Sequence, residues 1–199
     1  MTPNGTGLLT LGERMGLVTT VETGCLEFAR TFTYGFGGAE SNVAIGVARL
    51  GAPATWIGRL GTDATGDLIE RRLRAENVTT IAVRDPSLTG LMVKHRRFGT
   101  TLTVNYLRAG SAGSRLAADD IPPGCTEVAG VLHVTRITPA LSASAGEAVL
   151  AAVERARGAG ALVSLGLQLP SQDPSADSRD RRSIRSERAR GLRRADPQG

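Results

Sequence analysis

Several residue types are scarce in this 199-residue sequence. It has two cysteines, Cys25 and Cys125, and two histidines, so neither a disulfide framework nor a Cys/His zinc site is expected. No apolar run approaches the ~18–20 residues that a membrane span needs, and the first fifteen residues lack the pattern of a secretory signal. We therefore expect a soluble, cytoplasmic protein that makes no membrane contact.

Lysine is nearly absent, because Lys94 is the one lysine among 24 basic residues. The net charge of +5 is unevenly spread, since residues 170–199 hold eight arginines against five acids. That segment has few large aliphatic residues and cannot bury enough apolar surface to offset its ordering entropy. We expect residues 1–169 to fold and residues 170–199 to form an Arg-rich disordered tail. Binding of nucleic acid through this tail is an alternative, although its arginines are mixed with acids and lack interleaved aromatics.

Short apolar runs alternate with amphipathic stretches between residues 8 and 167. This alternation predicts parallel strands joined by helical crossovers, an α/β/α sandwich. Strands are expected at residues 8–11, 55–58, 79–83, 131–134 and 161–167. Helices are expected from Gly38 to Leu50 (heavily buried and ended by Gly51), from Asp63 to about residue 74, and from Ser142 to Arg157 (ended by Gly158).

Two segments, at about residues 14–37 and 88–108, do not fit this alternation. The first is rich in Thr, Gly and aromatic residues, and the second shows polar alternation; both patterns are typical of partly exposed strands. Within the second segment, residues 91–98 and 101–107 are expected to form a hairpin. We expect the two segments to pair as a small β-sheet beside the main domain.

The strongest local motif is Gly37-Gly38-Ala39-Glu40-Ser41-Asn42 at the start of a helix. Paired glycines let a ligand approach the backbone, and a helix N-terminus offers free N–H groups to polar oxygens. The alternative is a simple glycine turn in which Asn42 makes a local hydrogen bond. The motif alone does not separate these interpretations.

Motifs later in the sequence favour the ligand-binding interpretation of this glycine turn. Gly51 and the segment Ile57-Gly58-Arg59-Leu60-Gly61-Thr62-Asp63-Ala64-Thr65-Gly66 follow the glycine turn, and together they resemble the PfkB (ribokinase-like) carbohydrate kinases. Residues 89–91, 106–114 and 133–142 make the sequence similar to the 2-keto-3-deoxygluconate kinase branch. The resemblance extends over about residues 8–167.

The resemblance implies a ribokinase-like three-layer α/β/α sandwich with a β-clasp lid. It also implies Mg-dependent transfer of a phosphoryl group from ATP to a sugar acid such as 2-keto-3-deoxygluconate. Gly37, Gly38 and Asn42 match the turn that lines the sugar pocket, and Tyr106 and Arg108 match the sugar-contacting strand of the lid. A guanidinium can grip a carboxylate in a two-point fork, although Arg108 could also be a solvated strand charge. Open lid edges make a homodimer through the lid strands an expectation.

The sequence also departs from the family. Met92 stands where an aromatic residue is common, Gly166 replaces an acid, and Pro170 replaces an arginine. The family's C-terminal half, which carries the Gly-Ala-Gly-Asp anion hole, the catalytic base and the adenine site, has no counterpart here. We therefore expect an incomplete domain, from a truncated or frame-shifted product, in which no catalytic residue or metal ligand is present and ATP binding is doubtful. A non-catalytic sugar-acid-binding or regulatory protein is the alternative function.

Overall fold

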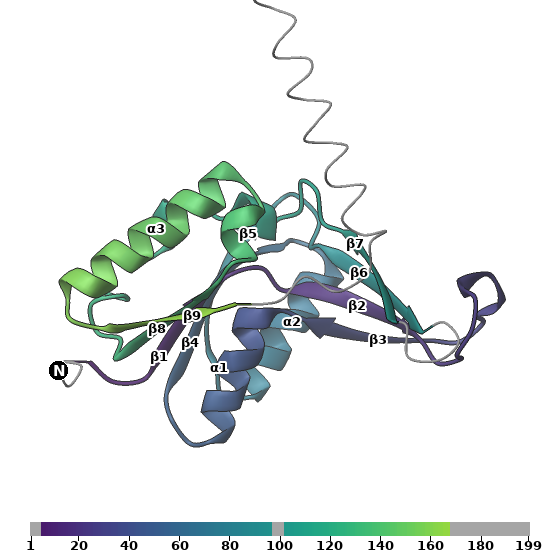
Figure 1. Ribbon diagram of the computed structural model, residues 1–199, viewed down its shortest axis with the longest axis horizontal. Coiled ribbons are helices and arrows are strands. Elements are labelled where there is room, and N and C mark those ends of the chain that lie inside the picture. The colour runs from purple at the N-terminus through teal and green to yellow at the C-terminus, as the bar shows by residue number, and fades with distance from the viewer. Residues whose placement is uncertain (1–4, 97–101, 168–199) are drawn as a thin grey trace, which may run out of the picture.

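The computed structural model describes residues 5–96 and 102–167, and a five-stranded parallel sheet lies at its centre (Figure 1). The strand order is β5-β4-β1-β8-β9, and every neighbouring pair is parallel. The bounds are β1 (Leu8–Leu11), β4 (Ala54–Gly61), β5 (Thr79–Asp85), β8 (Val131–Thr135) and β9 (Leu162–Gly166). The predicted strands are confirmed, and β4 and β5 run two or three residues further than expected.

Three helices cover the two faces of this sheet. In Figure 1, α3 (Ala143–Gly158) lies on one side and α1 (Ala39–Arg49) and α2 (Ala64–Ala75) lie on the other. Each face has its own apolar core. Leu9, Leu11 and Leu132 pack with α3, whereas Trp56 and Leu60 pack with α1 and α2. The predicted three-layer α/β/α sandwich is confirmed.

The helix ends follow the capping signals of the sequence. Asp63 Oδ1 accepts from the Gly66 N–H at 2.8 Å, and Ser142 Oγ accepts from the Ala145 N–H at 3.1 Å. Gly51 follows α1 with φ +86°, as predicted. The third helix ends at Gly158, as predicted, and Gly160 takes the left-handed conformation just beyond it (φ +81°).

The prediction that α1 is heavily buried is wrong. Of its eleven residues only Glu40, Ser41 and Ala44 are buried. Its other apolar side chains, Val43, Ile45, Val47 and Ala48, pack half-buried at the margin of the core. One face of the helix meets the sheet, so apolar residues all round it leave some partly in solvent.

A second sheet of four strands, which we call the clasp, projects beside the sandwich (Figure 1). Its order is β3-β2-β6-β7, with β2 (Met15–Thr20), β3 (Phe32–Gly37), β6 (Leu91–Arg96) and β7 (Leu102–Leu107). β2 and β6 pair in parallel, while β2–β3 and β6–β7 are antiparallel. The two segments outside the strand–helix alternation therefore join into one sheet, as predicted.

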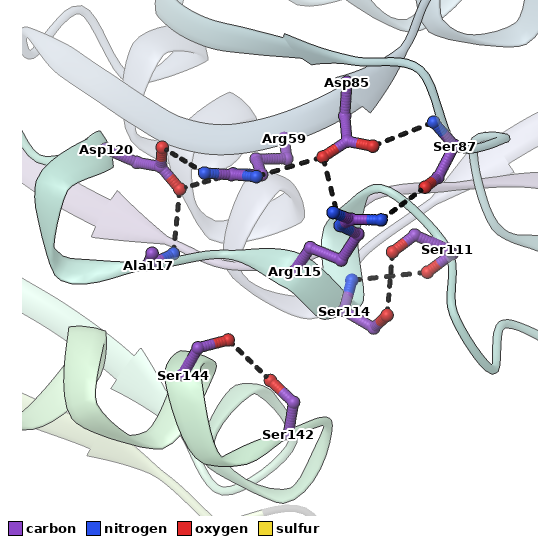
Figure 2. A network of polar contacts seen from close by, with 10 residues as sticks. All are labelled: Arg59, Asp85, Ser87, Ser111, Ser114, Arg115, Ala117, Asp120, Ser142 and Ser144. Carbon is purple, nitrogen blue, oxygen red and sulfur yellow. Dashed lines mark hydrogen bonds and ion pairs between the residues drawn. The ribbon is translucent and has the colours of Figure 1, made fainter.

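Short 3₁₀ turns complete the connections: η1 (Leu26–Phe28), η2 (Gly113–Arg115), η3 (Ala118–Asp120) and η4 (Thr138–Ala140). A polar network ties two of them to the sheet (Figure 2). Arg59 on β4 makes a two-point contact with Asp120, at 2.6 and 2.9 Å, and a bond of 3.0 Å to Asp85. Arg115 lies 3.4 Å from Asp85 and donates to Ser87 Oγ at 3.1 Å. This network fixes the chain that returns from the clasp to the sandwich.

Several predictions fall on residues outside the described ranges. These are the Arg-rich tail at residues 170–199 with its possible nucleic-acid contacts, the hairpin turn at Gly99-Thr100, and Pro170. The division at residue 169 therefore remains a prediction. Among the helices of the described ranges, none has the length and apolar character to cross a membrane.

Candidate functional site

A cavity of about 430 Å³ lies where the clasp meets the sandwich. Its walls come from the clasp, from the start of α1 and from the ends of β1 and β8. They are formed by Glu13, Met15, Leu17, Phe36, Gly37, Gly38, Ala39, Glu40, Asn42, Met92, Lys94, Val104, Tyr106, Arg108 and Ile137. In open α/β sheets, ligands bind at the carboxyl ends of strands where helices change from one face to the other. Here α1 and α3 lie on opposite faces next to β1 and β8, so the cavity occupies that position.

The chain crosses between sandwich and clasp four times, at residues 12–14, 37–38, 86–90 and 108–111, and we call these crossings the seam. A Cβ on Gly38 would lie 2.7 Å from the Glu13 carbonyl oxygen and 2.7 Å from Ser41 Oγ. A Cβ on Gly37 would lie 2.6 Å from Met92 Cε. Gly38 therefore has a packing reason in this structure, because it lets the backbone approach Glu13 closely, whereas the flexible end of Met92 could move away from a side chain at Gly37.

Arg108 lies on the cavity wall just after β7. Its Nε is 2.9 Å from Glu13 Oε2, and its Cζ lies 5.4 Å from the centre of the Tyr106 ring. Within the described ranges neither of its Nη groups donates a hydrogen bond. The guanidinium is thus held by Glu13 and Tyr106, and its Nη groups keep donors that no described residue uses.

Glu13 and Glu40 are two buried carboxylates at the cavity wall, with 4% and 1% of their surfaces exposed. Ser111 Oγ donates to Glu13 Oε1 at 2.6 Å. Thr135 Oγ1 and Thr138 Oγ1 both donate to Glu40 Oε1 at 2.6 Å. Burial raises the pKa of Glu13, an effect that Arg108 and Ser111 oppose. Glu40 connects α1 to the end of β8, while Glu13 connects β1 to the chain leaving the clasp.

Arg14 is buried too, but it lies outside the set of residues that line the cavity. Its Cζ stands 4.4 Å from the centre of the Phe36 ring, and its Nε and Nη1 atoms have no hydrogen-bond partner among the described residues. Burial lowers the pKa of Arg14 to about 10. The cationic side chains on the cavity wall are therefore Lys94 and Arg108.

All five residues that the sequence indicated, Gly37, Gly38, Asn42, Tyr106 and Arg108, line this one cavity. The Asn42 side chain makes no hydrogen bond within the described ranges, so the alternative of a local hydrogen bond has no support in this structure. Sequence reasoning missed Glu13, Glu40 and Lys94. The alternation along β6 could have indicated Lys94, because it faces the same side as Met92, which pairs with Tyr106.

Comparison with known proteins agrees with the geometry. The sequence matches the pfkB family of carbohydrate kinases over residues 7–180. It is 38% identical over 159 residues to the 2-dehydro-3-deoxygluconokinase of Bacillus subtilis (strain 168). This alignment covers 78% of this chain and 49% of that protein. The chain thus spans about half the length of the curated relatives it matches.

Solved structures show the same fold. The crystal structure of a PfkB protein from Polaromonas sp. JS666 matches with a TM-score of 0.79 and 35% identity, over 86% of this chain and 58% of that one. The sugar kinase PH1459 from Pyrococcus horikoshii in complex with ATP matches with a TM-score of 0.73 and 26% identity, over 82% and 53%. The fold is ribokinase-like, as the resemblance implied, and the chain belongs to the pfkB family of carbohydrate kinases.

Proposed function

We propose that this chain supplies the sugar-acid-binding half of a carbohydrate kinase that phosphorylates 2-keto-3-deoxygluconate or a closely similar sugar acid. The observation that carries the proposal is the Arg108 guanidinium on the cavity wall, which contacts Glu13 and Tyr106 and makes no hydrogen bond through its Nη groups within the described ranges. A planar guanidinium binds a carboxylate through two parallel hydrogen bonds, which a neutral sugar cannot match.

The rest of the cavity suits a short polyol. Its volume lies within the ~300–1,000 Å³ usual for small-molecule sites. Asn42 and the N-terminal turn of α1 offer donors to hydroxyl oxygens, while Leu17, Met92 and Val104 line the clasp side. Lys94 adds a second cation on the clasp wall. The name of the Bacillus subtilis relative supports the same substrate class.

ATP is the proposed phosphoryl donor, supported by the ATP complex of the PH1459 sugar kinase. Within residues 5–96 and 102–167, no three His, Cys, Asp or Glu side chains converge as metal ligands. Because a magnesium–nucleotide complex is usually held by one or two carboxylates together with the phosphates, we assign no metal ligand to the described residues. Their part in the reaction is to bind and orient the acid and to exclude water from it.

We propose further that the 199-residue chain alone does not phosphorylate a sugar acid. A steady-state assay with ATP, Mg²⁺ and 2-keto-3-deoxygluconate is expected to give no turnover, although the acid binds. Turnover near the lower end of the ~1–100 s⁻¹ usual for kinases would contradict this. Binding without turnover is also what a non-catalytic sugar-acid-binding protein would show.

The clasp also supports a homodimer. Its edge strands β3 and β7 have unpaired edges among the described residues, and aromatic side chains on it are exposed, Phe32 and Tyr34 among them. Such edges favour pairing with another copy. Sedimentation is expected to show a dimer, and a monomer at all concentrations would contradict it.

The test of the substrate class is calorimetric titration of the chain with 2-keto-3-deoxygluconate and with its neutral methyl ester. Arg108→Met is expected to weaken binding of the acid by about 10–100-fold, because a charged hydrogen-bond pair is lost. The ester should lose far less. Arg71→Met, which removes an exposed arginine on α2, is the control and should change neither affinity. Equal losses for acid and ester in Arg108→Met would refute recognition of the carboxylate.

A further inference from the structure

Glu13 occupies a space that two glycines far along the chain keep open for it. A Cβ on Gly113 would lie 2.4 Å from Glu13 Cγ, and a Cβ on Gly90 would lie 2.9 Å from Glu13 Oε1. Ser111 Oγ donates to Oε1 at 2.6 Å, while Oε2 lies 2.9 Å from Arg108 Nε. The carboxylate is therefore fixed beside the cation that faces the cavity.

The charge of Glu13 depends on very few neighbours. Arg108 is the cation in contact with it among the described residues, and Ser111 is its hydrogen-bond donor. Glu40, at the start of α1, is a like charge that adds to the effect of burial. Lys94 lies further along the clasp wall, and the Arg14 guanidinium lies over the Phe36 ring.

A second carboxylate on Arg108 changes this balance. When two carboxylates share one cation, each loses part of the stabilisation of its charge, and one of the pair takes up a proton more readily. Glu13 is the one that protonates, because burial already raises its pKa, whereas the 2-keto group makes the substrate a stronger acid.

We propose that Glu13 takes up one proton from solvent when a sugar-acid carboxylate binds Arg108. The proton bonds to a Glu13 carboxyl oxygen, the substrate carboxylate stays ionised, and no other bond forms or breaks. Glu13 is thus a positioning residue that holds Arg108 in the free protein and becomes neutral when the substrate carboxylate binds Arg108. The inference rests on the proposed function, since it requires an acid in the cavity.

The consequence is a linkage between pH and affinity. A ligand that binds together with one proton binds more tightly as pH falls, by at most about tenfold per pH unit. The dependence lies between the pKa of Glu13 in the free protein and its higher value in the complex. Above that window the acid must bind beside a charged Glu13, so its affinity is lowest there.

The test is titration of the full chain with 2-keto-3-deoxygluconate in buffers of different ionisation enthalpy, across about pH 5–8. The wild type is expected to take up as much as one proton per acid bound. Glu13→Gln, which keeps the shape but cannot take the proton, is expected to show no uptake and an affinity independent of pH. Glu147→Gln, on the exposed surface of α3, is the matched control and should behave as wild type.

Each outcome has a distinct meaning. Binding of the acid by the wild type with no proton uptake contradicts the inference alone, whatever the behaviour of the variant. The same uptake in Glu13→Gln and wild type also contradicts it, because another group would then carry the proton. No binding of the acid by the wild type contradicts the proposed function, and this inference with it.

Discussion

The seam between sandwich and clasp and the β9 edge of the central sheet are built in opposite ways. At the seam, glycines allow backbones to approach closely and buried carboxylates find donors within the described chain. On β9, Leu162, Val163 and Leu165 are 52%, 38% and 55% exposed, and β8 is the neighbour that the described residues give it. Parallel sheets are normally covered on both faces. The difference shows that contacts within the described chain hold the seam together, whereas the side chains of β9 contribute little to the packed core.

The largest difference in the free energy of unfolding is expected between substitutions at two leucines on neighbouring strands. Leu132 on β8 is fully buried, so Leu132→Ala should lower the free energy of unfolding by about 2–5 kcal/mol through lost burial and a cavity. Leu165→Ala on β9 should change it by no more than about 0.5 kcal/mol. Urea denaturation followed by circular dichroism measures both. Similar losses for the two variants would mean that β9 is covered in solution.

Two glycines, one at the start of α1 and one in its interior, differ in the space around them. A side chain at Gly38 would meet neighbouring atoms, whereas one at Gly46 would point into open space. Gly38→Ala should cost about 1–3 kcal/mol of unfolding free energy, because its Cβ would meet the backbone of Glu13. Gly46→Ala, in the interior of α1 with open space around it, should instead add up to about 1 kcal/mol. Thermal melting of both variants tests the pair. A stabilised Gly38→Ala would show that the seam is looser than these contacts imply.

The smallest effect is expected at Lys94. It lines the cavity from β6, paired with Val104 two residues beyond the Met92–Tyr106 pair, and makes no ion pair within the described ranges. Lys94→Met should weaken binding of 2-keto-3-deoxygluconate by about 2–5-fold, the range of a solvated ion pair. Lys94→Arg, which keeps the charge, is the control for titration. A loss as large as that of Arg108→Met would indicate that Lys94 contributes as much as Arg108 to binding of the carboxylate.

Sequence patterns predicted the fold well because hydrophobic periodicity is local. The strands, the three helices and the clasp follow from runs of neighbouring residues, and Asp63 and Ser142 cap helices as their residue types indicate. Gly158 ends α3, as its residue type indicates, and the left-handed conformation falls two residues later, at Gly160. The wrapping of apolar residues around α1 did not reveal that one of its faces lacks a covering layer.

The candidate site was only partly visible in the sequence. Tyr106 and Arg108 were found through a family resemblance, and the fold places them in the same cavity as Asn42. Glu13 could not be found this way, since its burial depends on Gly90 and Gly113, which lie far along the chain. A carboxylate in a short polar linker gives no sign by itself that it will meet a guanidinium.

The most direct measurement is a crystal structure of the 199-residue chain with 2-keto-3-deoxygluconate bound. The expected result is the acid in the cavity between clasp and α1, with its carboxylate oxygens about 2.7–2.9 Å from the Nη atoms of Arg108. Arg108 should keep its place over Tyr106. An acid bound outside this cavity, or one whose carboxylate points away from Arg108, would contradict the proposed recognition of the sugar acid.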